Sequence, residues 1–66
     1  MMDRDQQLDQ IAERYRRGAY TSQHAHFRVG QVLAEGGAEP SAWDCVTTLA
    51  DATLRVMGRA ANTRQP

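Results

Sequence analysis

The stretch "YRRGAYTSQHAHF", residues 15–27, decides the fold, because the chain either breaks within it or continues through it as one long helix. Gly18, Thr21 and Ser22 are residue types that turns tolerate. The positions that would line one helix face, however, keep steps of four and three residues across the whole stretch. They are Leu8, Ala12, Tyr15, Ala19, Ser22, His26, Val29 and Leu33. Since a glycine inside a helix costs only about 1 kcal/mol relative to alanine, we predict one helix over about residues 5–35.

A break within the same stretch is the alternative. Thr21 or Ser22 would then cap a new helix, and the chain would form a three-helix mini-bundle broken near Gly18–Ser22. Neither residue is followed three positions later by an acid or Gln, so a complete capping box is missing. The unbroken spacing therefore favours the long helix over the bundle.

The segment "EGGAEPS", residues 35–41, predicts a turn. Its two glycines can end a helix in the left-handed conformation, and its proline cannot continue one. Ser41 is followed three residues later by Asp44, which is close to a capping box. We therefore predict a second helix over about residues 42–60 that folds back to complete an antiparallel helical hairpin.

The predicted fold is thus all-α, with one helical domain over residues 1–60 and a frayed C-terminal tail over residues 61–66. A chain of 66 residues buries a small core, and such domains usually need a disulfide, a metal or a partner for support. Its one cysteine, Cys45, cannot form an internal disulfide. Association, as a homodimer or other homo-oligomer or with another protein, is therefore the expected support.

Two apolar surfaces would lack a cover in such a hairpin. The second helix is shorter than the first, so the N-terminal part of the first helix would project beyond it. The second helix also carries an apolar face wider than a surface helix needs. Contiguous exposed apolar surface marks an interaction site. The predicted partner-binding residues are Leu8, Ile11, Tyr15, Trp43, Val46, Ala50 and Met57.

The segment "ERYRRG", residues 13–18, is a local basic cluster. Arg14, Arg16 and Arg17 could make electrostatic contact with a phosphate or an acidic partner. A solvated helix face is the simpler interpretation, because Glu13 and Arg17 are spaced to pair on a helix.

The remaining residues offer no convincing catalytic, cofactor-binding or metal-binding set. His24 and His26 would point to different sides of a helix, so they would not share a metal ion. Cys45 lies on the apolar side of its helix, without the neighbours that activate a thiol. A phosphate-binding glycine loop is also missing. We therefore expect a protein that is not an enzyme and has no small-molecule substrate.

The net charge is zero, with eight acidic side chains and eight basic ones that are all arginine. This balance disfavours nucleic acid as a partner. The sequence shows neither a secretory signal nor an apolar run that could span a membrane. We expect a cytoplasmic protein of a bacterium, a phage or a mobile element.

The preferred function is a small protein-binding module, namely an adaptor, a co-chaperone or an inhibitor that acts through an exposed apolar helical face. The alternative is a small helix-turn-helix DNA-binding transcriptional regulator, with residues 22–34 as the reading helix. That helix supplies few side chains for bases or phosphates. A purely structural, self-assembling hairpin is a third interpretation.

In size and expected two-helix layout, the chain resembles the short co-chaperones of type III secretion needle subunits. The features that carry this resemblance are "EGG", residues 35–37, and "TLADATLRVM", residues 48–57. The resemblance implies a helical hairpin that binds another protein, and it assigns no role to any individual residue. Small inhibitors encoded by phages are similar in size but share no motif with the chain.

Overall fold

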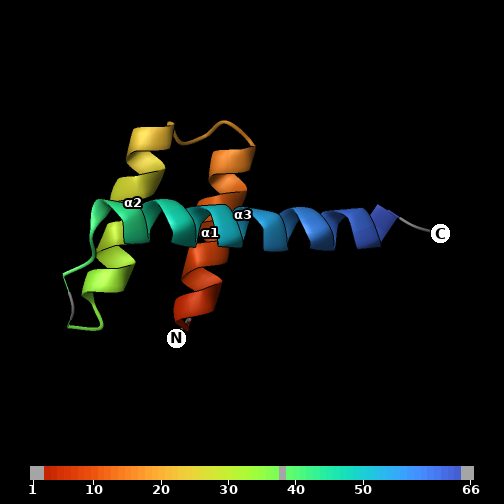
Figure 1. Cartoon of the computed structure of the whole chain (residues 1–66). Helices are drawn as coiled ribbons and strands as arrows, with labels where there is room; N and C mark the ends of the chain where they lie inside the picture. The colour runs from red at the N-terminus through yellow and green to blue at the C-terminus, as the bar shows by residue number, and fades with distance from the viewer. Residues whose placement is uncertain (1–2, 38, 65–66) are drawn as a thin grey trace.

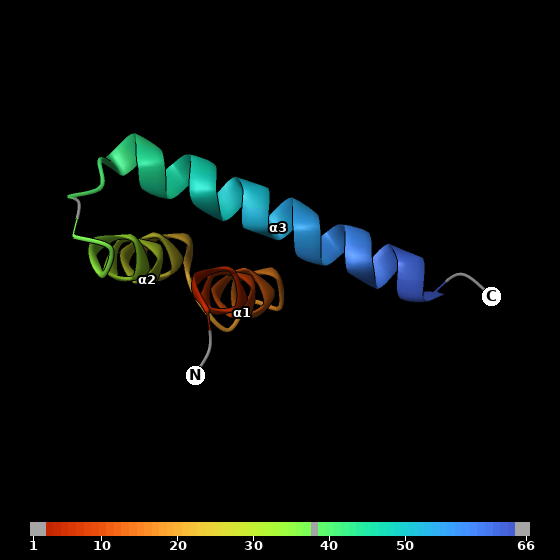
Figure 2. The same cartoon turned by 90° about the horizontal axis from the view of Figure 1, so that it is seen from below.

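The computed structural model describes residues 3–37 and 39–64, and it consists of three α-helices: α1 (Arg4–Arg16), α2 (Ser22–Ala34) and α3 (Ala42–Arg64). No strand occurs in the described residues, so the all-α prediction is confirmed. Helices α1 and α2 lie side by side and run in opposite directions, and α3 crosses both of them (Figure 1). The second view shows α1 and α2 on the same side of α3 (Figure 2).

The predicted single helix over residues 5–35 is wrong, and the three-helix alternative is the one found. The chain leaves α1 at Gly18, whose φ of +84° lies in the left-handed region that glycine adopts without strain. The N–H groups of Gly18 and Ala19 donate to the carbonyls of Tyr15 and Arg14, at 3.1 and 2.9 Å. This pattern is a Schellman motif, which supplies partners for carbonyls that the end of a helix leaves unpaired.

Helix α2 begins at a single-residue cap. The side-chain oxygen of Thr21 accepts a hydrogen bond from the N–H of His24 at 3.1 Å. A complete capping box is therefore not needed here, because one side-chain acceptor already satisfies one of the free N–H groups of the first turn. The break at Gly18 and the cap at Thr21 together separate the two helices.

The predicted start of the last helix is confirmed. The N–H of Asp44 donates to the hydroxyl of Ser41, and the N–H of Ser41 donates to the carboxylate of Asp44, both at 3.1 Å. The preceding turn contains Gly37 with a φ of +90°. Helix α3 continues to Arg64, so the first four residues of the predicted frayed tail are helical. No helix-breaking proline occurs before the end of this helix. Residues 65–66 lie outside the described residues.

The core lies where α3 crosses the α1–α2 pair, and each helix contributes three buried residues. They are Leu8, Ile11, Ala12, Ala25, Val29, Val32, Leu49, Ala52 and Val56. Three of the nine are alanines with no exposed surface, and such small side chains let helices approach closely. The half-buried side chains of Tyr15, Tyr20, Leu33 and Cys45 pack against the edge of this core.

Candidate protein-binding surface

Helix α3 carries two separate apolar faces. The inner face, which packs against α1 and α2, consists of Cys45, Leu49, Ala52 and Val56. The outer face consists of Trp43, Val46, Ala50, Leu54 and Met57. Both sets follow steps of three or four residues, so each forms a continuous line along the helix. The helix is therefore apolar on two sides, and its own chain covers only the inner one.

The outer face is exposed over its whole length. The exposed fractions are 73% for Trp43, 44% for Val46, 68% for Leu54 and 49% for Met57. Among the described residues, only one other large apolar side chain is exposed to this degree, namely Phe27 on α2, at 61%. A contiguous apolar surface of this kind is unfavourable in water, and it makes this side of α3 the candidate interaction surface.

The structure divides the predicted partner-binding residues into two groups. Trp43, Val46, Ala50 and Met57 are all exposed on the outer face. Leu54 is a fifth member of this face that was not among the predicted residues. The sequence contains the pattern that predicts this position. Leu54 continues the line of Ala50 and Met57 at helical spacing, and this line is separate from the residues of the inner face.

The other three predicted residues are not on a free surface, and the predicted uncovered overhang of the first helix is wrong. Leu8 and Ile11 are only 5% exposed and belong to the core, and Tyr15 is half-buried against it. The physical reason is the break at Gly18, which places α2 and α3 against the apolar side of α1. These side chains stabilise the fold and present no overhang to a partner.

The three arginines of the basic cluster all have partners within the chain. Arg14 donates a hydrogen bond to the hydroxyl of Tyr20 at 2.8 Å, and this bond lowers the pKa of Tyr20 below its ordinary value. Arg16 and Arg17 pair with Glu13 at 2.8 and 3.1 Å, and the hydrogen bond from Arg16 is the main cause of a lowered Glu13 pKa. The arrangement agrees with a solvated, internally paired helix face.

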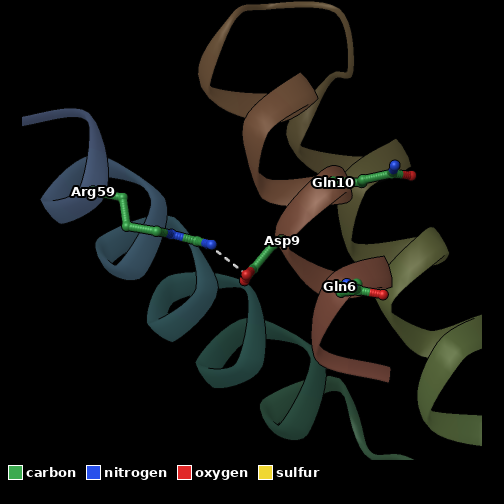
Figure 3. Close-up of a pocket in the computed structure, with 4 residues that line it drawn as sticks. All are labelled: Gln6, Asp9, Gln10 and Arg59. Carbon is green, nitrogen blue, oxygen red and sulfur yellow. Dashed lines mark hydrogen bonds and ion pairs between the residues drawn. The ribbon is translucent and has the colours of Figure 1, made fainter. Parts of the chain in front are cut away.

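A polar flank of α3 is tied to α1 through Asp9. Arg55 contacts the Asp9 carboxylate at 2.9 Å, and Arg59 pairs with its other oxygen. Figure 3 shows Asp9 and Arg59 pointing toward one another in a pocket that Gln6 and Gln10 also line. Partial burial alone would raise the pKa of Asp9, but the hydrogen bonds and charges of the two arginines outweigh burial and lower it. The flank adds a polar contact between α1 and α3 and leaves the outer face uncovered.

His24 and Cys45 each make a structural contact with another helix or loop of the described part of the chain. The ring of His24 packs edge-on against the ring of Tyr20, with centroids 4.6 Å apart. No three His, Cys, Asp or Glu side chains of the described residues gather closely enough to hold a metal ion. Cys45 is a half-buried free thiol whose sulfur lies against Gly30 of α2.

Over residues 3–37 and 39–64, none of the helices combines the length and the apolar character that crossing a membrane requires. No protein-family model matches the chain, and no significant match was found among curated proteins or among solved structures. The outer face is therefore assigned as the candidate site from its geometry and chemistry.

Proposed function

We propose that the chain is a small, non-enzymatic protein-binding module, such as an adaptor, a co-chaperone or an inhibitor, that holds another polypeptide on the outer face of α3. The observation that carries this proposal is the exposure of Trp43, Leu54 and Met57 on a side of α3 away from the core. The proposal places the chain in the cytoplasm of a bacterium, with its gene carried by the host, a phage or a mobile element. The single free cysteine agrees with a reducing compartment.

The chemistry of the outer face indicates what kind of contact it makes. Fully burying a large apolar side chain contributes about 1.5–3 kcal/mol, and several such side chains stand in one line. Tryptophan is among the residues that most often dominate binding energy at protein interfaces. None of the five members of the face carries a charge. A helix or an apolar groove of the partner, laid along α3, is the occupant that this surface suits.

The alternative of a DNA-binding regulator receives less support from the same contacts. A reading helix needs several free basic or amide side chains along one side. On α2 the only arginine, Arg28, bonds to Gln31 at 3.0 Å, and the arginines of residues 13–18 pair within the chain. The net charge of zero supplies little attraction for phosphates.

A capture experiment with matched variants tests the proposed function. The tethered chain is exposed to an extract of its source cells, alongside Leu54→Glu on the outer face and Phe27→Glu on α2. Both variants place the same charge at a strongly exposed apolar position. They differ only in location, because Leu54 lies on the outer face of α3 and Phe27 lies on α2. We expect one protein to be captured by the wild type and by Phe27→Glu and to be lost with Leu54→Glu.

The captured protein is then purified, and its binding to the chain is measured by calorimetry. Saturable binding that Leu54→Glu weakens and Phe27→Glu leaves unchanged supports the proposal. Equal binding to all three forms of the chain, or binding that only Phe27→Glu weakens, contradicts the assignment to the outer face.

A further inference from the structure

The outer face of α3 is self-complementary when two copies of the helix are laid antiparallel. We consider the register that places Ala50 of one copy opposite Leu54 of the other. Two-fold symmetry then also places Trp43 of one copy opposite Ala61 of the other. Both pairs combine a large side chain with a small one, which is how helix ridges fit into grooves. The same register overlaps the two helices over nearly all of residues 42–64.

The area of the outer face is that of a weak dimer. A fully buried aromatic side chain alone covers about 150–250 Å², and with the exposed fractions given above the face presents on the order of 500 Å² per chain. Complete burial of two such faces would approach a total of about 1,000 Å², which is the lower limit for a specific interface. Because α1 and α2 lie on the same side of α3, a second copy can lie along the other side without meeting them (Figure 2).

We infer that, without another partner, the occupant of the outer face is a second copy of this chain, which forms a two-fold homodimer through antiparallel α3 helices. This inference rests on the proposed function in so far as both use the outer face. The dimer masks the surface that the partner needs, so binding of the partner and self-association compete. The competition makes availability of the face depend on the concentration of the chain.

Sedimentation equilibrium on the purified chain, from low to several hundred micromolar, tests the dimer without any other protein. We expect the mass to rise from 7.4 kDa toward twice that value. Leu54→Glu should remain a single chain, and Phe27→Glu should behave as the wild type. Circular dichroism of each variant verifies that its helices are formed. A wild type that stays single throughout, or a Leu54→Glu variant that still associates, overturns the inference.

A pair of charged variants tests the two-fold contact between Ala50 and Leu54. One chain carries Ala50→Glu and Leu54→Glu, and the other carries Ala50→Arg and Leu54→Arg. Like charges should prevent each chain from pairing with itself, and a mixture should form a mixed dimer. Absence of the mixed dimer contradicts the facing pair.

The outcomes separate the inference from the proposed function. A chain that stays single but binds a captured protein through the outer face disproves the dimer and keeps the function. A dimer that forms through the outer face, together with the absence of any captured protein that Leu54→Glu releases, keeps the dimer and disproves the proposed function.

Discussion

The two faces of α3 are both apolar but have different roles in the molecule. The inner face combines the small Cys45 and Ala52 with Leu49 and Val56, and this mixture lets α3 approach the helix pair beneath it. The outer face carries the larger Trp43 and stays exposed. The difference shows that apolar spacing identifies a face that needs cover. The sizes of the side chains and the surfaces of the neighbouring helices decide which face the chain itself covers.

The largest expected difference between the faces comes from the same change made on each of them. Leu49 is 3% exposed and Leu54 is 68% exposed. Leu49→Ala should lower the free energy of unfolding by about 2–5 kcal/mol, because it removes buried contacts and leaves a cavity. Leu54→Ala should change it by less than about 0.5 kcal/mol. Urea unfolding, followed by circular dichroism in dilute solution, measures both. Equal losses would show that the outer face is also covered in the single chain.

A smaller effect is expected where the chain turns back between α1 and α2, the two helices that cover the inner face. Gly18 has a positive φ, and an alanine there would be strained even though space is available for its Cβ. Gly18→Ala should lower the free energy of unfolding by about 1–2 kcal/mol. Thermal unfolding of the dilute chain provides the measurement. Unchanged stability would mean that the connection between α1 and α2 does not need the left-handed conformation.

An exposed position of α3 that belongs to neither face offers a change of opposite sign. Gly58→Ala should raise the free energy of unfolding of the single chain by up to about 1 kcal/mol, since alanine favours a helix and no atom of the chain obstructs it. The same denaturation experiment measures the gain, with Gly18→Ala as the matched substitution at a strained glycine. A loss of stability would reveal a contact at Gly58 within the single chain.

The smallest effect concerns the polar flank between the two faces. Asp9 has a pKa below its ordinary value of 3.8 because the hydrogen bonds and charges of Arg55 and Arg59 outweigh the opposing effect of burial. A lowered pKa in the folded state means that its contribution is present above pH 3.8 and is lost as the pH falls through the lower, folded pKa. Both arginines are substantially exposed, so we expect a contribution of about 1 kcal/mol or less.

Unfolding measurements between pH 6 and pH 2 detect this contribution, with Asp9→Asn as the comparison. The wild type should be more stable at the upper end of the range, and the difference between the two should shrink as the pH falls. A constant difference would assign the effect of Asp9→Asn to something other than its charge.

Part of the fold could be predicted because it depends on local hydrogen bonds. The capping box of Ser41 and Asp44 and the turn before it are visible as residue types at fixed spacing. The break at Gly18 could not be predicted from spacing, because α1 and α2 happen to keep one helical phase across it. What ends α1 is the backbone conformation of Gly18, and the residues on either side of it do not specify that conformation.

The candidate site was predicted in part for a related reason. The width of the apolar face on the last helix correctly indicated surplus surface at Trp43, Val46 and Met57. Leu54 was missed because a single wide face was considered where two separate lines exist. Leu8 and Ile11 were assigned to a partner because the hairpin left them uncovered, and only the third helix shows that the chain covers them itself.

Helix α3 also determines how the molecule tumbles. The chain measures 43 × 25 × 18 Å, and α3 lies along the longest of these dimensions (Figure 1). A single chain of this shape rotates anisotropically, fastest about the axis of α3. A second chain added alongside would double the thickness and hardly change the length, so rotational diffusion would slow while becoming more nearly isotropic.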